Sequence, residues 1–502
     1  MLKRLIWALL CALFVWPMAA AGPQDLTPAP VEYSLTGGIS KCGLDQAIVL
    51  KSQGFLKEIE SLPQWKQNEA YRISVERFSV LIEAASDEGV FRARQTLRQL
   101  QLLGGDVPCC IIMDYPRFRH RGLMIDESRT FKGLDFLKKQ MDAMALLKLN
   151  VLHLHLVDAD GWRIESEAYP LLTSKTAWRI GRTHPEWKAA GFRYSSQDDP
   201  KAYGGFYSAA QLREIVAYAA ERYITVIPEI EMPGHSTEVG FAYPEVLCVS
   251  SSGHRFTGSW DVCPGSEATF EFLETILAEV MDIFPGPFIH IGGDEAIMNA
   301  WPKCVNCRQR MKDEGIHDYR QLQGYLVRRI DEFVRSHGRR IIGWDEILET
   351  GVPEDAVVQS WRGIEGGLKA SKAGHDVVLS PNRFCYLDHY QDYYRKEPKA
   401  RSPLISLRIC YSFDPVASGM VEEHVLGLQG NLWCEYIPTP EHAEYMIYPR
   451  LFAVAETGWS REKSYESFRP RAEKLCEVLK GLGYNTFDLQ GESSLGRSGR
   501  RD

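Results

Sequence analysis

The chain has 502 residues, of which 45% are hydrophobic and 25% are charged, a balance typical of a soluble globular protein with more than one domain. Its formal net charge is −8, and the basic residues form no cluster outside the carboxyl-terminal tail. The charge therefore argues against the nucleic-acid-binding classes.

Residues 1–21 have the pattern of an export signal. Lys3 and Arg4 precede an apolar run over 5–15, and three alanines at 19–21 offer a cleavage site before Gly22. The pattern predicts a mature chain that is periplasmic or extracellular. The alternatives are an uncleaved membrane anchor and a lipid attached to Cys11, which is disfavoured because Leu10 precedes it. No other segment approaches membrane-spanning length, so the mature chain is expected to have no membrane partner.

Residues 22–112 predict a small α/β domain. The stretch 71–82 alternates like two strands around a turn, and a helical pattern covers 90–103. Ser86, followed by two acidic residues, is a suitable N-cap for that helix.

Residues 113–460 alternate between strand and helix patterns. The expected strands are 121–126, 151–157, 224–231, 287–291, 340–345, 356–360, 376–380 and 425–432, and the expected helices are 134–149, 208–223, 268–283, 320–336, 364–372 and 440–456. Eight strands separated mostly by helices predict a closed (β/α)8 TIM barrel. An open doubly wound sheet is the alternative, although no Gly-x-Gly-x-x-Gly follows the early strands.

Two further segments have a predicted role. The loop over 165–207 is rich in Trp, Tyr, Gly and Pro and is too long for a simple connection, so we expect it to shape a pocket at the barrel mouth. Residues 461–502 contain one helical pattern, 468–482, followed by a polar Gly/Ser/Arg tail that is expected to be disordered.

The cysteines favour neither a metal nor a dense disulfide framework. Loss of Cys11 with the signal leaves 11 of the 12, so at least one thiol is unpaired. Cys248 and Cys263 flank a polar loop and are the best disulfide candidates. Cys304 and Cys307 have zinc-like spacing, but no second such pair appears, so a loop disulfide or free thiols are favoured there.

The stretch 288–295 carries the strongest chemical signal. An apolar run ends in two glycines followed by Asp294 and Glu295, as in a buried strand with reactive groups at its tip. Neighbouring side chains on an extended segment point in different directions, so the two carboxylates are expected to address different parts of a bound molecule. This division suggests acid/base chemistry on a sugar-like substrate, and the alternative is an acidic pair that caps the next helix.

Other polar and aromatic residues follow the carboxyl ends of the predicted strands, which is where barrel enzymes place their active sites. They are Asp158, His235, Trp344, Trp361, Tyr386, Asp388, Trp433 and Glu435.

Several stretches, in the same order along the chain, resemble the motifs of glycoside hydrolase family 20. They are Arg121 to Arg129, His153 to Asp158, Pro228 to His235, His290 to Glu295, and Trp433 to Glu435. The chain departs from the pattern at Ala159, which separates two aspartates that are usually adjacent, and at Glu231, where aspartate is commoner.

The resemblance implies an exo-acting β-N-acetylhexosaminidase that releases terminal GlcNAc or GalNAc with retention, using the substrate's own acetamido oxygen as nucleophile. By resemblance, Glu295 is the acid and base, Asp294 orients the acetamido group and Tyr386 donates a hydrogen bond to it. The expected substrate-binding residues are Arg121, Asp158, His235, Trp344, Trp361, Asp388, Trp433 and Glu435. A carbohydrate is the expected partner, with no cofactor and no metal.

The roles of two residues follow from the residues themselves. Arg121 either holds sugar hydroxyls or forms an ion pair inside the barrel with Asp158 or Asp126. The pKa of Glu295 is expected to be raised by the neighbouring Asp294. The rival functions are a glycosidase with a protein nucleophile (Glu231 or Glu346), a disaccharide-releasing relative, and a non-catalytic sugar-binding protein.

Overall fold

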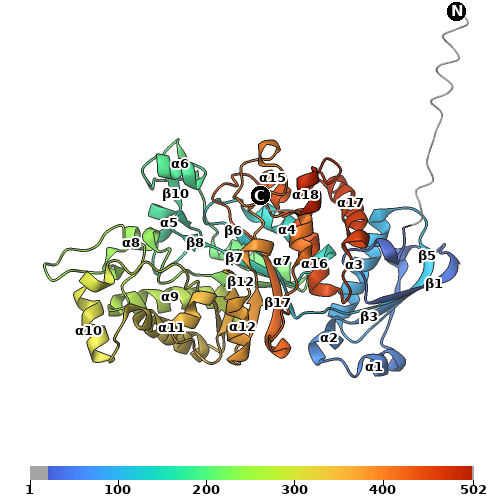
Figure 1. Ribbon diagram of the computed structural model, residues 1–502, viewed down its shortest axis with the longest axis horizontal. Coiled ribbons are helices and arrows are strands. Elements are labelled where there is room, and N and C mark those ends of the chain that lie inside the picture. Colours follow the sequence, from blue (N-terminus) through green and yellow to red (C-terminus); the bar gives the residue numbers. More distant parts are fainter. Residues whose placement is uncertain (1–20, 500–502) are drawn as a thin grey trace, which may run out of the picture. The chain divides into compact units, whose positions relative to one another are not determined.

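The computed structural model describes residues 21–499, without the side chain of Arg395, so the predicted signal sequence over 1–21 lies outside the described residues except for Ala21. The chain divides into two compact units, 21–115 and 116–499 within that range (Figure 1). No helix between residues 21 and 499 is long and apolar enough to cross a membrane.

The first unit is a five-stranded sheet with helices. Its strands follow the order β1-β5-β3-β4-β2 and are antiparallel except for the β2–β4 pair. The elements are β1 (Glu32–Ile39), α1 (Gln53–Ile59), α2 (Gln64–Glu69), β2 (Ile48–Leu50), β3 (Tyr71–Val75), β4 (Val80–Ala84), α3 (Asp87–Leu103) and β5 (Pro108–Asp114). Ser86 caps α3 by accepting a hydrogen bond from the Gly89 amide at 3.2 Å, as its position in the sequence predicts.

The second unit is built on a closed barrel of eight parallel strands, which confirms the predicted fold class. The strand order around the barrel is β12-β13-β14-β15-β16-β17-β6-β7. The strands are β6 (His120–Asp126), β7 (Val151–His155), β12 (Thr225–Glu229), β13 (Phe288–His290), β14 (Arg340–Trp344), β15 (Val357–Ser360), β16 (Val377–Leu379) and β17 (Val425–Leu432). Because β17 pairs with β6, the sheet closes and the open-sheet alternative is excluded.

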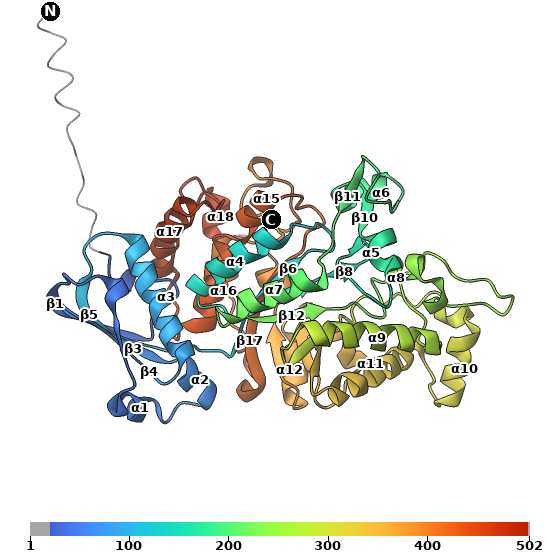
Figure 2. The same ribbon diagram turned by 180° about the vertical axis from the view of Figure 1, so that it is seen from behind.

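Helices surround these strands, and α4, α7, α9 and α11 lie in front of the barrel in Figure 2. The helices between strands are α4 (Leu134–Leu146), α7 (Ala209–Ala220), α8 (Thr237–Ala242), α9 (Glu267–Ile283), α10 (Val305–Asp313), α11 (Tyr319–Ser336), α12 (Glu365–Lys372), α13 (Asn382–Cys385) and α14 (Leu407–Ser412). The helix predicted over 440–456 is two helices, α15 (Pro440–Ile447) and α16 (Arg450–Trp459). Pro449 separates them because proline lacks the amide that a continuous helix would need.

The segment 165–207 folds into α5 (Leu171–Thr176), β10 (Trp178–Ile180), α6 (His184–Ala189) and β11 (Ala202–Gly204), after a small hairpin of β8 (Val157–Asp158) and β9 (Gly161–Trp162). The carboxyl-terminal segment contains α17 (Tyr465–Gly481) and α18 (Ser494–Ser498). The prediction of a disordered tail is wrong for residues up to 499. Glu492 pairs with Arg469, and the Ser493 amide donates to Asp392 at 2.7 Å.

The barrel interior changes from apolar to polar along the strands. Five aliphatic side chains from five strands form one buried cluster: Val151, Ile227, Ile342, Val357 and Val378. Beyond them, Glu229 at the end of β12 accepts from Trp344 Nε1 at 2.8 Å and contacts His153, His155 and His290. Burial would raise the pKa of Glu229, but the three histidines outweigh it and hold this pKa well below its ordinary value. This charged layer supports the rim above it.

Candidate active site

A cavity of about 420 Å³ opens at the carboxyl-terminal rim of the barrel. It is lined by Arg129, His235, Asp294, Glu295, Trp344, Trp361, Tyr386, Arg401, Trp433 and Glu435. Part of this volume is open to solvent, so the cavity is a mouth rather than a closed chamber.

The turn that carries Asp294 and Glu295 follows β13 directly. Gly292 and Gly293 have φ values of +65° and +95°, and Glu295 itself has a φ of +46°, which is uncommon for a residue with a side chain. A Cβ on Gly292 would lie 1.8 Å from a carboxylate oxygen of Glu231, so only glycine fits there. The turn leaves Asp294 8% exposed, whereas the Glu295 side chain is 56% exposed. The two carboxylates therefore face different surroundings, as the sequence predicts.

His235 connects these carboxylates to a buried acid. Its Nδ1 lies 2.9 Å from Asp158, and its Nε2 lies 3.6 Å from Asp294 and 3.5 Å from Glu295. The ring is covered by Trp260 at 4.3 Å between centroids. Burial would lower the pKa of His235, but the charges of Asp158 and Asp294 outweigh it and hold this pKa well above its ordinary value.

The prediction that Glu295 has a raised pKa is wrong. The polar contact with His235 at 3.5 Å is the largest influence, and it lowers the pKa of Glu295 below its ordinary value, although partial burial opposes it. A carboxylate beside a histidine that stays protonated is stabilised in its charged form. Sequence proximity to Asp294 does not reveal this, because His235 comes from the loop after a different strand.

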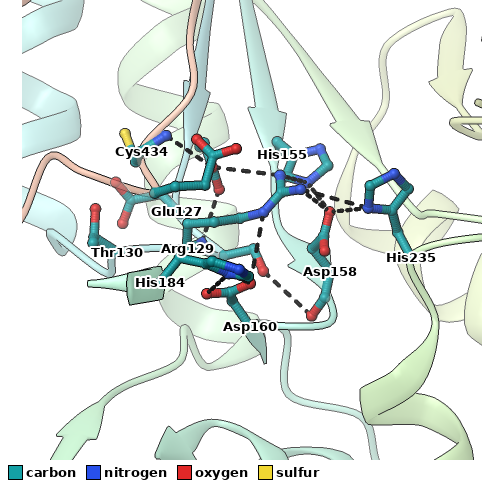
Figure 3. Close-up of polar contacts among 12 residues, drawn as sticks. Glu127, Arg129, Thr130, His155, Asp158, Asp160, His184, His235 and Cys434 are labelled. Atoms are coloured by element: carbon teal, nitrogen blue, oxygen red, sulfur yellow. Dashed lines mark hydrogen bonds and ion pairs between the residues drawn. The ribbon is translucent and has the colours of Figure 1, made fainter. Parts of the chain in front are cut away.

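Arg129 lies under the cavity in a network of buried polar groups (Figure 3). Its guanidinium is 2.6 Å from Asp158 and 2.9 Å from His155 Nε2, and it lies 5.1 Å over the Trp433 ring. In Figure 3, Asp158 lies between this guanidinium and His235, so one carboxylate orients both cations.

Aromatic rings form the walls. Trp361 and Tyr386 stack with 6.2 Å between centroids and an interplanar angle of 15°, and Trp433 lies 6.2 Å from Tyr386 and 5.9 Å from Trp344. Burial raises the pKa of Tyr386 well above its ordinary value, so its hydroxyl remains a hydrogen-bond donor at neutral pH. Such walls accept the apolar face of a sugar ring.

Two family models match the chain: "Glycosyl hydrolase family 20, catalytic domain" over residues 118–462, and "Glycosyl hydrolase family 20, domain 2" over residues 45–115. The chain belongs to glycosyl hydrolase family 20. It is therefore a glycoside hydrolase, and the family resemblance found in the sequence is confirmed.

Among similar family 20 proteins, a beta-hexosaminidase of Porphyromonas gingivalis is 37% identical over 90% of this chain, which spans 56% of that relative's length. A beta-hexosaminidase of Vibrio furnissii is 36% identical over 88% of this chain and 77% of its own. A solved family 20 exo β-N-acetylglucosaminidase of Vibrio harveyi, in complex with N-acetylglucosamine, is 30% identical with a TM-score of 0.80, and the match covers 93% of this chain and 78% of that one.

Eight of the eleven site residues predicted from the sequence line the cavity: His235, Asp294, Glu295, Trp344, Trp361, Tyr386, Trp433 and Glu435. Asp158 lies behind it, fully buried, and contacts Arg129 and His235. Asp388 is also buried behind the wall and lies 3.2 Å from Arg401.

The prediction that Arg121 holds sugar hydroxyls is wrong, because Arg121 is fully buried and does not line the cavity. Asp158 and Asp126, the acids expected to pair with it, pair with Arg129 instead. Arg121 is the second residue of β6, at the far end of the strand from the rim. Its guanidinium donates to the carbonyls of Lys148 and Phe118 at 2.9 and 2.8 Å. Of the two arginines in this motif, the one that reaches the cavity is Arg129, which lies beyond the carboxyl end of the strand.

The long segment 165–207 contributes no side chain to the lining of the cavity in the described part of the chain, contrary to the prediction that it shapes the pocket. It supports the rim from outside instead. The His184 ring lies 2.9 Å from Asp160, and the His184 amide donates to the Glu435 carbonyl at 3.0 Å. Arg401, which pairs with Glu435, was missed because it lies in an irregular segment between β16 and β17 without any motif.

Proposed function

We propose that this family 20 chain is an exo-acting β-N-acetylhexosaminidase that hydrolyses terminal, non-reducing β-linked GlcNAc or GalNAc with retention of configuration. The observation that carries the proposal is the pair Asp294 and Glu295, held on one turn with one carboxylate buried and the other exposed at the mouth. The aromatic walls of the cavity, Trp344, Trp361, Tyr386 and Trp433, support release of one sugar at a time.

In the proposed first step, the substrate's acetamido oxygen attacks the anomeric carbon while Glu295 protonates the departing glycosidic oxygen. Asp294 and the Tyr386 hydroxyl hold the acetamido group and balance the charge of the oxazolinium intermediate. Water then attacks the same carbon, and Glu295 accepts its proton. A nucleophile held within the substrate can have an effective concentration of about 10⁵ M or more, so orientation is the enzyme's main task.

A protein nucleophile is less well supported. Glu231 is 3% exposed, and burial followed by the charge of Asp294 raises its pKa well above the ordinary value. Burial and the same charge raise the pKa of Glu346 to about 8, and Glu346 accepts a hydrogen bond from Trp361 Nε1 at 3.0 Å. A raised pKa favours the protonated form of both carboxyl groups, and a protonated carboxylic acid is a poor nucleophile.

The deciding experiment is hydrolysis of 4-nitrophenyl 2-acetamido-2-deoxy-β-glucoside, its galacto epimer and the plain β-glucoside. We expect release of nitrophenol from the acetamido substrates and none from the plain glucoside, because the last has no internal nucleophile. Cleavage of the glucoside at a similar rate would show a protein nucleophile. Inactivity on all three, with release of a disaccharide from a longer substrate, would favour the disaccharide-releasing alternative.

The contact between His235 and Glu295 predicts a specific pH dependence. The pKa of His235 is raised and that of Glu295 is lowered. At pH values between these two pKa values the pair of side chains therefore holds one proton, which it loses only above the pKa of His235. In the His235→Gln variant this proton must reside on Glu295 alone. The alkaline limb of kcat/KM should therefore move down by at least about two pH units, because about two units separate ordinary histidine and glutamate pKa values and the pKa of His235 is raised further.

The control for this prediction is a substrate with a leaving group that needs little protonation. On that substrate the alkaline limbs of the wild type and His235→Gln should lie closer together, since the acid matters less. An unchanged alkaline limb with both substrates would show that His235 does not share the catalytic proton.

We also propose export of the chain, supported by the basic, apolar and small-residue pattern over residues 1–21. Amino-terminal sequencing of protein made with its own leader should give a mature chain that begins at Gly22. A chain that retains residues 1–21 would contradict cleavage.

A further inference from the structure

Four cysteines come together outside the active site. Cys248 and Cys263 belong to the segment that follows β12, and Cys304 and Cys307 belong to the segment that follows β13. All four are fully buried. The Sγ atom of Cys263 lies 3.5 Å from the Sγ atom of Cys304 and 3.5 Å from that of Cys307. The Sγ atom of Cys248 lies 3.7 Å from that of Cys307, and all four sulfurs are within 4.8 Å of one another.

We propose that these four sulfurs bind one zinc ion as a structural tetrathiolate site. Four sulfurs at about 2.3 Å from a tetrahedral zinc ion lie about 3.8 Å from one another, close to the separations seen here. When one Zn²⁺ binds, it replaces the protons of the four thiols, and these four protons pass to the solvent. With four protein ligands the site is closed, and it takes no part in the glycosidase chemistry.

The arrangement of the sulfurs is that of a cluster rather than of two bonded pairs. Cys263 is equally close to Cys304 and Cys307, and Cys307 is close to both Cys248 and Cys263. The predicted Cys248–Cys263 disulfide is therefore wrong, and all cysteines in residues 21–499 are unpaired. The second pair that a zinc site needs is present, but its members are far apart in the sequence.

The surroundings favour thiolates. Cys304 is the N-cap of α10 and Cys307 is in its first turn. The positive end of a helix stabilises a negatively charged sulfur. Ala300, Trp301 and Leu322 pack around the cluster and keep water out, as expected of a closed structural site.

The ion would join two loops that carry active-site residues. The Asp261 carboxylate accepts from the amides of Ile297 and Met298 at 3.0 and 2.7 Å, just after Glu295. The Val262 amide donates to the carbonyl of Pro233 at 2.9 Å, two residues before His235. A link between Cys263 and Cys304 therefore fixes the segment that contacts both loops, and zinc positions His235 and Glu295 from a distance.

The first test uses the purified full chain without any substitution. We expect one zinc per chain by elemental analysis, with the four cluster thiols reacting with a thiol reagent in denaturant once a chelator is present. If no metal is found and four of the chain's thiols do not react with the reagent, the four cysteines form two disulfides and the proposal is overturned. Absence of metal with all thiols reactive would also overturn it, as would iron in place of zinc.

The second test compares Cys304→Ser with Cys476→Ser, which makes the same change at a buried cysteine of α17 outside the cluster. Bound zinc should fall more than about tenfold in Cys304→Ser and remain at one per chain in Cys476→Ser. Replacement of zinc by cobalt should give the strong visible absorption of a tetrahedral thiolate site in the wild type. Equal zinc in both variants would contradict the assignment, and the result does not depend on the proposed glycosidase activity.

Discussion

The Glu295→Gln variant is expected to lose about 10²–10⁴-fold in kcat/KM on natural β-glycosides, the usual worth of a positioned acid. The amide keeps the size of the side chain but cannot donate a proton to a poor leaving group. On a 4-nitrophenyl glycoside the loss should be smaller in the first step, because nitrophenolate departs without protonation. The measurement is steady-state kinetics of the wild type and the variant on the 4-nitrophenyl glycoside and on a natural, chitobiose-type substrate.

The same variant should respond to azide on the aryl substrate. Azide attacks the oxazolinium intermediate without a general base, so it should accelerate turnover and give a product with retained configuration. The exposed Glu245→Gln serves as the matched control and should behave as the wild type. Equal losses on both substrates, together with no effect of azide, would remove Glu295 from the acid/base role.

The barrel could be predicted from the sequence because its strands are short apolar runs bounded by turn residues. β6 and β17 match their predicted ranges to within one residue. The rim residues followed from the same reasoning, since Asp294, Trp344 and Trp433 come at or just beyond strand ends. A side chain at that place in a parallel barrel must face the mouth or the wall beside it.

The error at Arg121 came from a motif rather than from this rule. Position along the strand separates the two arginines: Arg121 is the second residue of β6, whereas Arg129 follows its carboxyl end. Applied strictly, the strand-end rule selects Arg129 from the sequence alone. The buried Asp158 contacts Arg129 and His235 behind the cavity, so the strand-end rule does not separate residues that line the mouth from residues that lie behind its wall.

The remaining failures concern groups that meet only through the fold. The pKa of Glu295 depends on His235, and the cysteine cluster depends on contacts between residues 41 to 59 positions apart. Periodicity and local spacing carry no information on such encounters. A search for zinc ligands as two short-spaced pairs therefore misses a site in which only Cys304 and Cys307 are neighbours.

The Asp294→Asn variant is expected to lose about 10²–10³-fold in kcat with little change in KM, the magnitude typical of one lost electrostatic contact to a developing charge. Asn has the shape of Asp, so the acetamido group can still bind, but the intermediate loses its counter-charge. The charge of Asp294 also contributes to keeping Glu231 and Glu346 neutral, so its removal lowers the pKa of both. The buried Asp331→Asn in α11 is the matched control for the loss of a buried carboxylate. A raised KM with unchanged kcat would show that Asp294 stabilises the bound substrate and the transition state equally, and would leave the intermediate without a protein counter-charge.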